Sequence, residues 1–167
     1  PAALPFLEEM AQQARQLTVK WFGAERSIYT PLDLANYCEN YCVYCGFNCH
    51  NKINRLKLNE DGMEREMQAI AATGLREILL LTGESRSMSG VEYIASAVRL
   101  ARKYFAVVGL EVYPLNSDEY AYLHECGADA VTVLQEPSDV SAYATLYLAA
   151  HYVICPHVFH PADRPFI

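Results

Sequence analysis

Three cysteines in one short segment are the residues of this chain best suited to do chemistry. Cys38, Cys42 and Cys45 follow the spacing Cys-x3-Cys-x2-Cys, which can bring three thiolates onto one loop. Three thiolates can bind three irons of a 4Fe-4S cluster and leave the fourth without a protein ligand, whereas four-cysteine ligation is usual for electron transfer. An open metal position can bind and activate a small molecule, as it does in catalytic zinc sites. The spacing therefore predicts an iron–sulfur cluster with one open iron.

Zinc, core packing and disulfides are the alternatives for these cysteines. A zinc site would add Cys49 or His50 as fourth ligand, but structural zinc sites usually contain paired cysteines separated by a longer finger, and no second Cys-x2-Cys pair occurs. Free cysteine is often buried, but three so close together in a stretch rich in Asn, Glu and Tyr do not suit a core. A disulfide framework fits poorly, because no secretory segment is visible and 167 residues can build a core without staples.

The composition is that of an ordinary globular protein. The 167 residues are 52% hydrophobic and carry a formal charge of −7, from 13 basic and 20 acidic side chains. This charge argues against nucleic acid or an anionic membrane as the main partner, because both require a basic surface. No apolar run approaches the roughly 20 residues that cross a bilayer. Six cysteines then indicate the reducing cytoplasm, where thiolates stay free for metal.

The elements that must position the cysteines follow from apolar periodicity. A helix is predicted over residues 5–20, with Gly23 as its stop, and a strand over residues 27–34 that leads directly into the cysteine loop. Beyond the loop, strands and helices alternate. Strands are predicted over 77–81, 107–112 and 130–134, the first and last as buried. Helices are predicted over 60–73, after Leu58-Asn59, and over 89–104, 116–126 and 138–150. Asn116 and Glu119 have the spacing of a capping box.

This alternation predicts an α/β fold with a parallel sheet, either doubly wound or a (β/α) barrel. About four units are visible, and a closed eight-fold barrel typically needs about 250 residues. The expected fold is therefore a partial (β/α) barrel, about the first half of a TIM-like barrel. Three regions are expected: an N-terminal helical segment over 1–26, the partial barrel over 27–150 and an atypical tail over 151–167.

Polar residues follow each predicted strand, at the edge where parallel α/β folds collect functional groups. The cysteine loop follows the first strand and the segment 82–85 the second. Glu111 closes the third strand, and Gln135 with Glu136 closes the fourth. A carboxylate at a strand end can bind ribose hydroxyls or a substrate ammonium group, and a surface charge is the plainer alternative. We predict that Glu111 contacts cofactor and that Gln135 and Glu136 contact substrate.

Two of these motifs resemble those of the radical S-adenosylmethionine (SAM) enzymes. The cysteine spacing, with Tyr44 just before the last cysteine, resembles the signature of that class, and Thr82-Gly83-Glu84 resembles its GGE element. The resemblance implies SAM as a cofactor, whose methionine amino group binds backbone carbonyls of residues 82–84. It also implies that the backbone of Tyr44 lies against adenine. Gly83 would permit close approach, and Glu84 would hold its loop or balance the cationic cofactor. By itself the Gly-Glu pair is equally consistent with a solvated turn, and Tyr44 with plain packing.

A narrower resemblance extends over residues 6–136. The matching segments, in order, are 28–32, 38–47, 81–85, 111–115 and 134–136. They look like 2-iminoacetate synthase, the tyrosine lyase of thiamine thiazole synthesis. The resemblance implies cleavage of the Cα–Cβ bond of L-tyrosine to 2-iminoacetate and p-cresol, through a 5′-deoxyadenosyl radical made from SAM. It also implies two partners, thiazole synthase and a reduced flavodoxin or ferredoxin-type electron donor.

The chain departs from that family at two places. Asp33 stands where the family usually has a tyrosine expected near the substrate, and an acid there can meet an ammonium group. After Glu136 the resemblance fades, and residues 151–167 match nothing expected, which suggests a truncated or frameshifted product. Two alternatives remain: an aromatic amino acid lyase of the hydrogenase-maturation type, whose second-strand loop reads Ala-Gly-Glu-Asp-Pro, and an inactive fragment that binds iron–sulfur or zinc.

Overall fold

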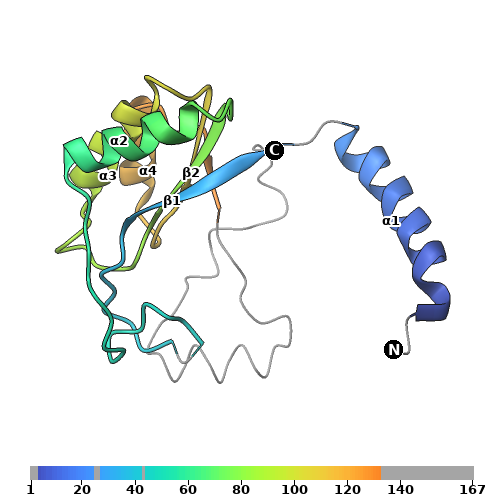
Figure 1. The fold of residues 1–167 in the computed structure, drawn as a ribbon, viewed down its shortest axis with the longest axis horizontal. Helices are drawn as coiled ribbons and strands as arrows, with labels where there is room; N and C mark the ends of the chain where they lie inside the picture. Colours follow the sequence, from blue (N-terminus) through green and yellow to red (C-terminus); the bar gives the residue numbers. More distant parts are fainter. Residues whose placement is uncertain (1–3, 25–26, 43, 133–167) are drawn as a thin grey trace.

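A parallel sheet of four strands organises the chain in the computed structural model, which describes residues 4–24, 27–42 and 44–132 (Figure 1). The strands lie in the order β1-β2-β3-β4. Their bounds are Tyr29–Ala35 for β1, Glu77–Thr82 for β2, Val107–Glu111 for β3 and Ala130–Val131 for β4. Successive strands are connected by the helices α2 (Glu60–Ala71), α3 (Val91–Ala101) and α4 (Ser117–Glu125).

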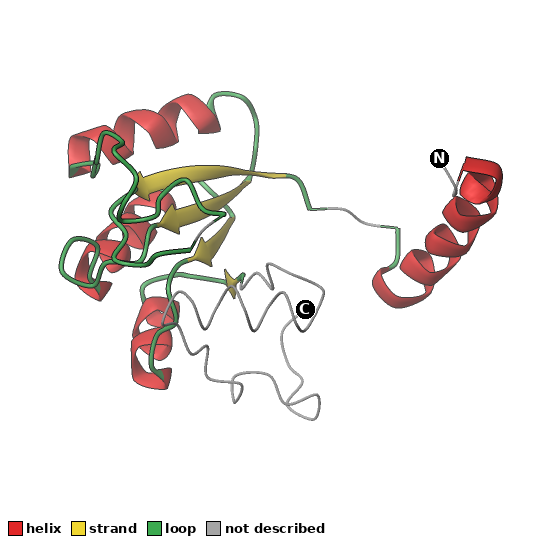
Figure 2. Cartoon of the chain, turned by 90° about the horizontal axis from the view of Figure 1, so that it is seen from below, coloured by secondary structure: helices red, strands yellow, loops and turns green. Residues whose placement is uncertain are grey.

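The strand order distinguishes between the two architectures that the sequence allows. Crossovers between parallel strands are right-handed, so connections that always step in the same direction put every helix on one face. Helix α2 packs on α3 and α3 on α4, and Figure 2 shows them along the outer side of the sheet. A doubly wound sheet reverses its strand order, and the four described strands do not. The fold is therefore part of a (β/α) barrel, as predicted.

The hydrophobic core lies between the sheet and the three helices. Leu34, Leu80 and Leu110 of neighbouring strands are fully buried, and they form one cluster with Met67 and Val98 of the helices. The apolar run of β2 also buries Leu79, on the opposite face, to 7% exposure. Both faces of β2 are therefore covered, which is why its sequence is continuously apolar rather than alternating.

Local sequence signals fix most of the helix ends. Asn59 caps α2 by accepting a hydrogen bond from the Gly62 N–H at 2.9 Å. The predicted capping box of α4 is present, and the Glu119 carboxylate accepts from the Asn116 N–H at 2.7 Å. Gly74, in the turn after α2, adopts a φ of +88°, which favours glycine.

Several predicted boundaries need correction. The first strand is shifted to Tyr29–Ala35, and α3 is shorter at both ends than the predicted 89–104. Strand β4, predicted to be buried, is exposed, with Val131 at 41%. It pairs with β3 alone among the described strands, so one side lacks a described neighbour. Residues 133–134 of the predicted strand, Gln135, Glu136, the helix over 138–150 and the tail over 151–167 lie outside the described residues.

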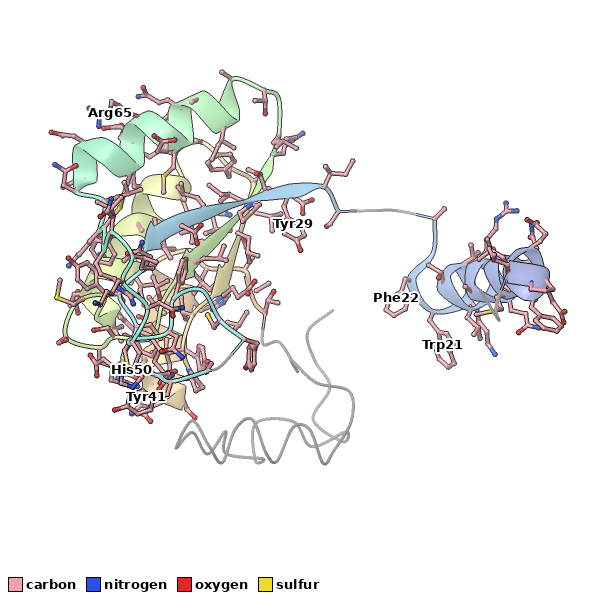
Figure 3. All side chains as sticks on the ribbon, turned by 60° about the horizontal axis from the view of Figure 1, so that its bottom comes forward. Trp21, Phe22, Tyr29, Tyr41, His50 and Arg65 are labelled. Carbon is pink, nitrogen blue, oxygen red and sulfur yellow. The ribbon has the colours of Figure 1, made fainter. Side chains whose placement is uncertain are left out.

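Helix α1 (Leu7–Phe22) stands apart from the sheet, after a short 3-10 turn at Leu4–Phe6 (Figures 1 and 3). The predicted helix type is confirmed, and Gly23 ends the helix with a φ of +71°. None of its residues is buried. Trp21 and Phe22 are more than half exposed, at 61% and 63%. Among the described residues, no helix is long and apolar enough to span a membrane.

Candidate cluster and cofactor site

The cysteine loop begins at the end of β1 and presents its thiols on a compact, hydrogen-bonded turn. Cys38, Cys42 and Cys45 are partly buried and form no disulfide. The Cys45 N–H donates to the Cys42 carbonyl at 3.1 Å, and the Cys49 N–H donates to the Asn40 carbonyl at 2.9 Å. These bonds fold the segment back on itself, so that the residues after the third cysteine lie beside those before the second.

Two asparagine side chains hold the carbonyls of this turn. Asn48 Nδ2 donates to the Cys42 carbonyl at 3.0 Å. Asn51 Nδ2 donates to the carbonyls of Cys45 and Gly46 at 3.3 and 3.1 Å. The described residues of this loop form no helix or strand that would satisfy these groups, so side-chain amides do so instead.

The pKa of the Cys42 thiol is affected by its burial and by the two neighbouring thiols. Burial raises the pKa of the Cys42 thiol above its ordinary value, a hydrogen bond with the Tyr44 side chain opposes this, and the charges of Cys38 and Cys45 raise the pKa further. Neighbouring thiolates that raise the proton affinity of Cys42 favour a cation at this loop, because metal ligation displaces the proton.

The loop after β2, residues 82–85, lies directly against the cysteine loop. The Gly83 N–H donates to the Ala35 carbonyl at 2.8 Å. A Cβ atom at Gly83 would overlap the carbonyl of Tyr37. Glycine is therefore required here by a close backbone approach to the start of the cysteine loop. The predicted approach of Gly83 to cofactor stays a prediction. Gly83 holds the ends of β1 and β2 together.

Carboxylates latch the two loops to each other. The Glu84 carboxylate accepts from Asn40 Nδ2 at 2.6 Å, and the Glu84 carbonyl accepts from the Glu39 N–H at 2.9 Å. In return, the Glu39 carboxylate accepts from the hydroxyls of Ser85 and Ser87 at 2.7 and 3.2 Å. Glu84 thus holds the loops together, as predicted in one of its two roles. Glu39 was not predicted, because its only signal was an acid between two cysteines.

Other predicted site residues lie near this junction. The Thr82 hydroxyl, at the end of β2, is buried and has no hydrogen-bond partner among the described residues. Asp33 pairs with Leu81, and Leu81 pairs with Glu111. Because Leu32 and Leu34 point into the core, the alternation of β1 puts Asp33 on the opposite face, away from the helices. Asp33 and Glu111 therefore flank Leu81 on the face that a barrel turns inward.

The donor set is rich in thiols and fits an iron–sulfur cluster. Four free thiols lie on this loop, those of Cys38, Cys42, Cys45 and Cys49, whereas the His50 ring stacks on Tyr41 with 4.7 Å between ring centroids (Figure 3). Within the described ranges, no three His, Cys, Asp or Glu side chains are gathered closely enough to hold a single metal ion. A cluster bridged by sulfides spreads its ligands over several irons, so it needs three thiols on one loop rather than three at one metal.

Known proteins share both the sequence and the fold. The chain is 41% identical over 148 residues to 2-iminoacetate synthase of Escherichia coli (strain K12), covering 89% of this chain and 39% of that protein. The corresponding values for the Salmonella typhimurium enzyme are 40%, 89% and 39%. The 3-methylornithine synthase of Methanosarcina acetivorans is 31% identical over 78 residues, covering 47% of this chain and 22% of that protein. No family model matches the chain.

Two solved structures have the same fold. HydG, a maturase of the [FeFe]-hydrogenase, superposes with a TM-score of 0.76 at 23% identity, over 86% of this chain and 33% of HydG. Methylornithine synthase (PylB) superposes with a TM-score of 0.71 at 22% identity, over 86% of this chain and 43% of PylB. The fold is therefore the partial (β/α) barrel that these two proteins share with the chain.

The sequence matches 2-iminoacetate synthase over 89% of this chain, which confirms the resemblance seen in its motifs. The chain spans about two-fifths of the length of these curated relatives, from their coverage of 39%.

Proposed function

We propose that this chain carries the cluster-binding and SAM-binding portion of a radical SAM carbon–carbon lyase of the 2-iminoacetate synthase type. Such an enzyme cleaves the Cα–Cβ bond of L-tyrosine to give 2-iminoacetate and p-cresol. One observation carries the proposal. The loop after β1, which contains the free thiols of Cys38, Cys42 and Cys45, is hydrogen-bonded to the loop after β2 through the carboxylates of Glu39 and Glu84. The 41% identity to 2-iminoacetate synthase supports the reaction.

The cysteines would hold the cluster and the neighbouring residues would hold SAM. When bound, a 4Fe-4S cluster supplies the electron that splits SAM into methionine and a 5′-deoxyadenosyl radical. The residues of the second-strand loop would bind the methionine end, and the unpartnered Thr82 hydroxyl supports this because it is a buried group in need of a partner. Glu111, at the end of β3, would contact ribose hydroxyls, and the backbone of Tyr44 would lie against adenine.

The substrate would bind on the inward face of the sheet. Asp33 is exposed there, in the same layer as Glu111, with Leu81 between them. A carboxylate at this position suits the ammonium group of an amino acid. Gln135 and Glu136 would complete the substrate contacts. Thiazole synthase as recipient of 2-iminoacetate, a flavodoxin or ferredoxin-type donor and a cytoplasmic location belong to the same proposal.

Anaerobic reconstitution tests the metal centre. The chain should bind about four irons per molecule and no stoichiometric zinc, because three thiolates are the minimum for an open-site cluster. Cys38→Ala, Cys42→Ala and Cys45→Ala should each abolish iron binding, and Cys49→Ala should leave the iron content unchanged. Loss of iron in the Cys49 variant would show a four-cysteine site and overturn the open-iron proposal.

Product analysis tests the reaction class. The reconstituted, dithionite-reduced protein is mixed with SAM, with and without L-tyrosine, and 5′-deoxyadenosine and p-cresol are measured by mass spectrometry. Both products should depend on Cys38. Because the chain spans 39% of the length of 2-iminoacetate synthase, it should form 5′-deoxyadenosine but release little p-cresol. Grafting the second half of a full-length homologue after Glu136 should restore p-cresol release, and a graft that forms 5′-deoxyadenosine without p-cresol would reject tyrosine as substrate. Absence of both from a protein that retains its iron would reject the proposed function.

A further inference from the structure

The guanidinium group of Arg55 donates hydrogen bonds to several backbone carbonyls of the cysteine loop. Its Nη1 donates to the carbonyls of Asn36 and Phe47 at 2.7 and 2.8 Å. Its Nη2 donates to the carbonyls of Asn48 and Asn51 at 2.7 and 3.4 Å. No carboxylate of the described residues forms an ion pair with it. One partly buried guanidinium group therefore holds four carbonyl oxygens.

These carbonyls come from both sides of the cysteine loop. Asn36 precedes Cys38 by two residues, and Phe47 follows Cys45 by two residues. Carbonyl dipoles that converge on one point repel one another, and only a cation with several diverging donors stabilises such an arrangement. The planar fork of arginine has that shape, whereas the lysine ammonium is a single point with three donors.

The backbone around Arg55 is itself fixed to the end of β1. The Asn36 amide side chain accepts from the Leu56 N–H at 2.7 Å and donates to the Asn54 carbonyl at 2.9 Å. Lys57 forms an antiparallel bridge with Ala35. The guanidinium group therefore extends from an anchored backbone, so it is held next to the end of β1.

Arg55 also acts on the cysteines through a second layer of amides. It holds the carbonyls of Asn48 and Asn51, whose side chains in turn donate to the carbonyls of Cys42 and Cys45. Loss of the guanidinium group would release the backbone that aims those two amides. We propose that Arg55 is a positioning residue that sets the shape of the cysteine loop before the cluster binds. The identity of the cluster rests on the proposed function, but the ordering of the loop does not.

Thiol reactivity in the metal-free protein tests the ordering directly. Arg55→Met and Arg55→Lys are compared with Arg65→Met, which changes an exposed arginine on α2 (Figure 3). Alkylation of each cysteine by iodoacetamide is followed by mass spectrometry, with Cys126 as the internal reference after α4. Arg55→Met should speed alkylation of Cys42 and Cys45 several-fold and leave Cys126 unchanged. Arg55→Lys should behave like Arg55→Met, because one ammonium cannot hold carbonyls on both sides.

Cluster retention supplies the second readout. In the reconstituted protein, Arg55→Met should accelerate iron loss to a chelator about ten-fold, the size typical when a residue that orients metal ligands is lost. Arg65→Met should lose iron at the wild-type rate.

Three results would overturn the proposal. They are wild-type alkylation in Arg55→Met, full recovery in Arg55→Lys, and an equal rise in Cys126 reactivity, which would indicate a general structural role. If the wild-type chain binds no iron, the proposed function fails, and the alkylation rates alone then decide the role of Arg55.

Discussion

Different interactions stabilise the two regions of the molecule, the sheet with its helices and the cysteine loop. In the sheet and helices, large apolar side chains such as Leu34, Leu80 and Ile94 are fully buried. In the loop, residues 36–57, no described residue is buried, and its shape depends on hydrogen bonds from asparagine and arginine side chains. Full burial of one such apolar side chain contributes about 1.5–3 kcal/mol, and one hydrogen bond about 0.5–1.5 kcal/mol net.

This difference implies that the two regions can be damaged separately. A loop held by polar bonds can open while the sheet stays folded, because local stability follows local burial. Each prediction below changes one region and asks whether the other responds.

The largest effect is expected from the middle of the sheet. Leu80→Ala removes a fully buried side chain from β2 and should lower the free energy of unfolding by about 2–5 kcal/mol, because the cavity cannot fully collapse. Leu56→Ala, at the end of the loop and 67% exposed, should change it by less than about 0.5 kcal/mol. Denaturant titration of the metal-free chain measures both. Equal effects would show that the loop is packed as tightly as the sheet.

A smaller effect is expected where the two regions meet. Gly83→Ala puts a methyl group into the carbonyl of Tyr37 and should cost about 1–3 kcal/mol, because two backbones must separate. It should also lower SAM affinity. The matched control is Gly46→Ala inside the cysteine loop, where a Cβ atom has open space. If Gly46→Ala lowered the free energy of unfolding more than Gly83→Ala, the close contact between Gly83 and Tyr37 would not be important for stability.

Tyr93 connects helix α3 to the root of the loop. Its hydroxyl lies 2.9 Å from the carbonyls of both Leu34 and Leu58, which share its single proton. Tyr93→Phe should cost about 1 kcal/mol. Burial raises the pKa of Tyr93 from its ordinary 10.0 to about 12. The neutral form stabilises the fold, so this contribution is complete below pH 10.0 and is lost as the pH rises toward 12.

The pH dependence of that variant provides a separate check. Unfolding of wild type and Tyr93→Phe is compared at pH 8 and at pH 11, conditions on the two sides of the ordinary tyrosine pKa of about 10. The difference between the two proteins should shrink at the higher pH. A difference that grows with pH would mean that the phenolate, and not the phenol, is the stabilising form.

The smallest effect on folding is expected from the hydrogen bonds of Glu39 and Glu84 that join the two loops, here called the latch. Glu39→Ala removes the acceptor for the Ser85 and Ser87 hydroxyls and should cost only about 0.5–1 kcal/mol, because these groups can turn to water. Its effect on SAM affinity should be larger, because the second-strand loop would no longer be held to the cysteine loop. Isothermal titration of the reconstituted protein with SAM measures this, with Glu66→Ala, an exposed acid on α2, as control. Equal SAM affinity in both variants would contradict a role for the latch in cofactor binding.

Local patterns predicted most of the fold, and they could do so because periodicity and caps act over a few residues. The apolar run of β2, the Asn116–Glu119 box and Gly23 each indicated its element correctly. The exposure of Val131 was not predictable in this way, because it depends on whether a strand has a neighbour, and no local pattern records that.

For the site, the sequence predicted which segments meet but not what joins them. The cysteine loop and residues 82–85 meet because parallel strands end at one edge. The contacts that join them pair Glu39 with Ser85, 46 residues apart, and Asn40 with Glu84, 44 residues apart. Partner choice over such distances has no periodic signal. The role of Arg55 could not be predicted either. Its partners are backbone carbonyls, which every residue type has, so no residue pattern marks them.

Electron paramagnetic resonance of the reduced, reconstituted protein tests the central claim most directly, namely that the two loops form one site for an open-iron cluster and SAM. SAM should change the spectrum of the wild type and change it much less in Gly83→Ala. Glu125→Ala, an exposed residue at the end of α4, should respond like the wild type. A wild-type spectrum that stays the same at saturating SAM would contradict the account, because no cofactor would then reach the open iron of the cluster that Cys38, Cys42 and Cys45 would hold.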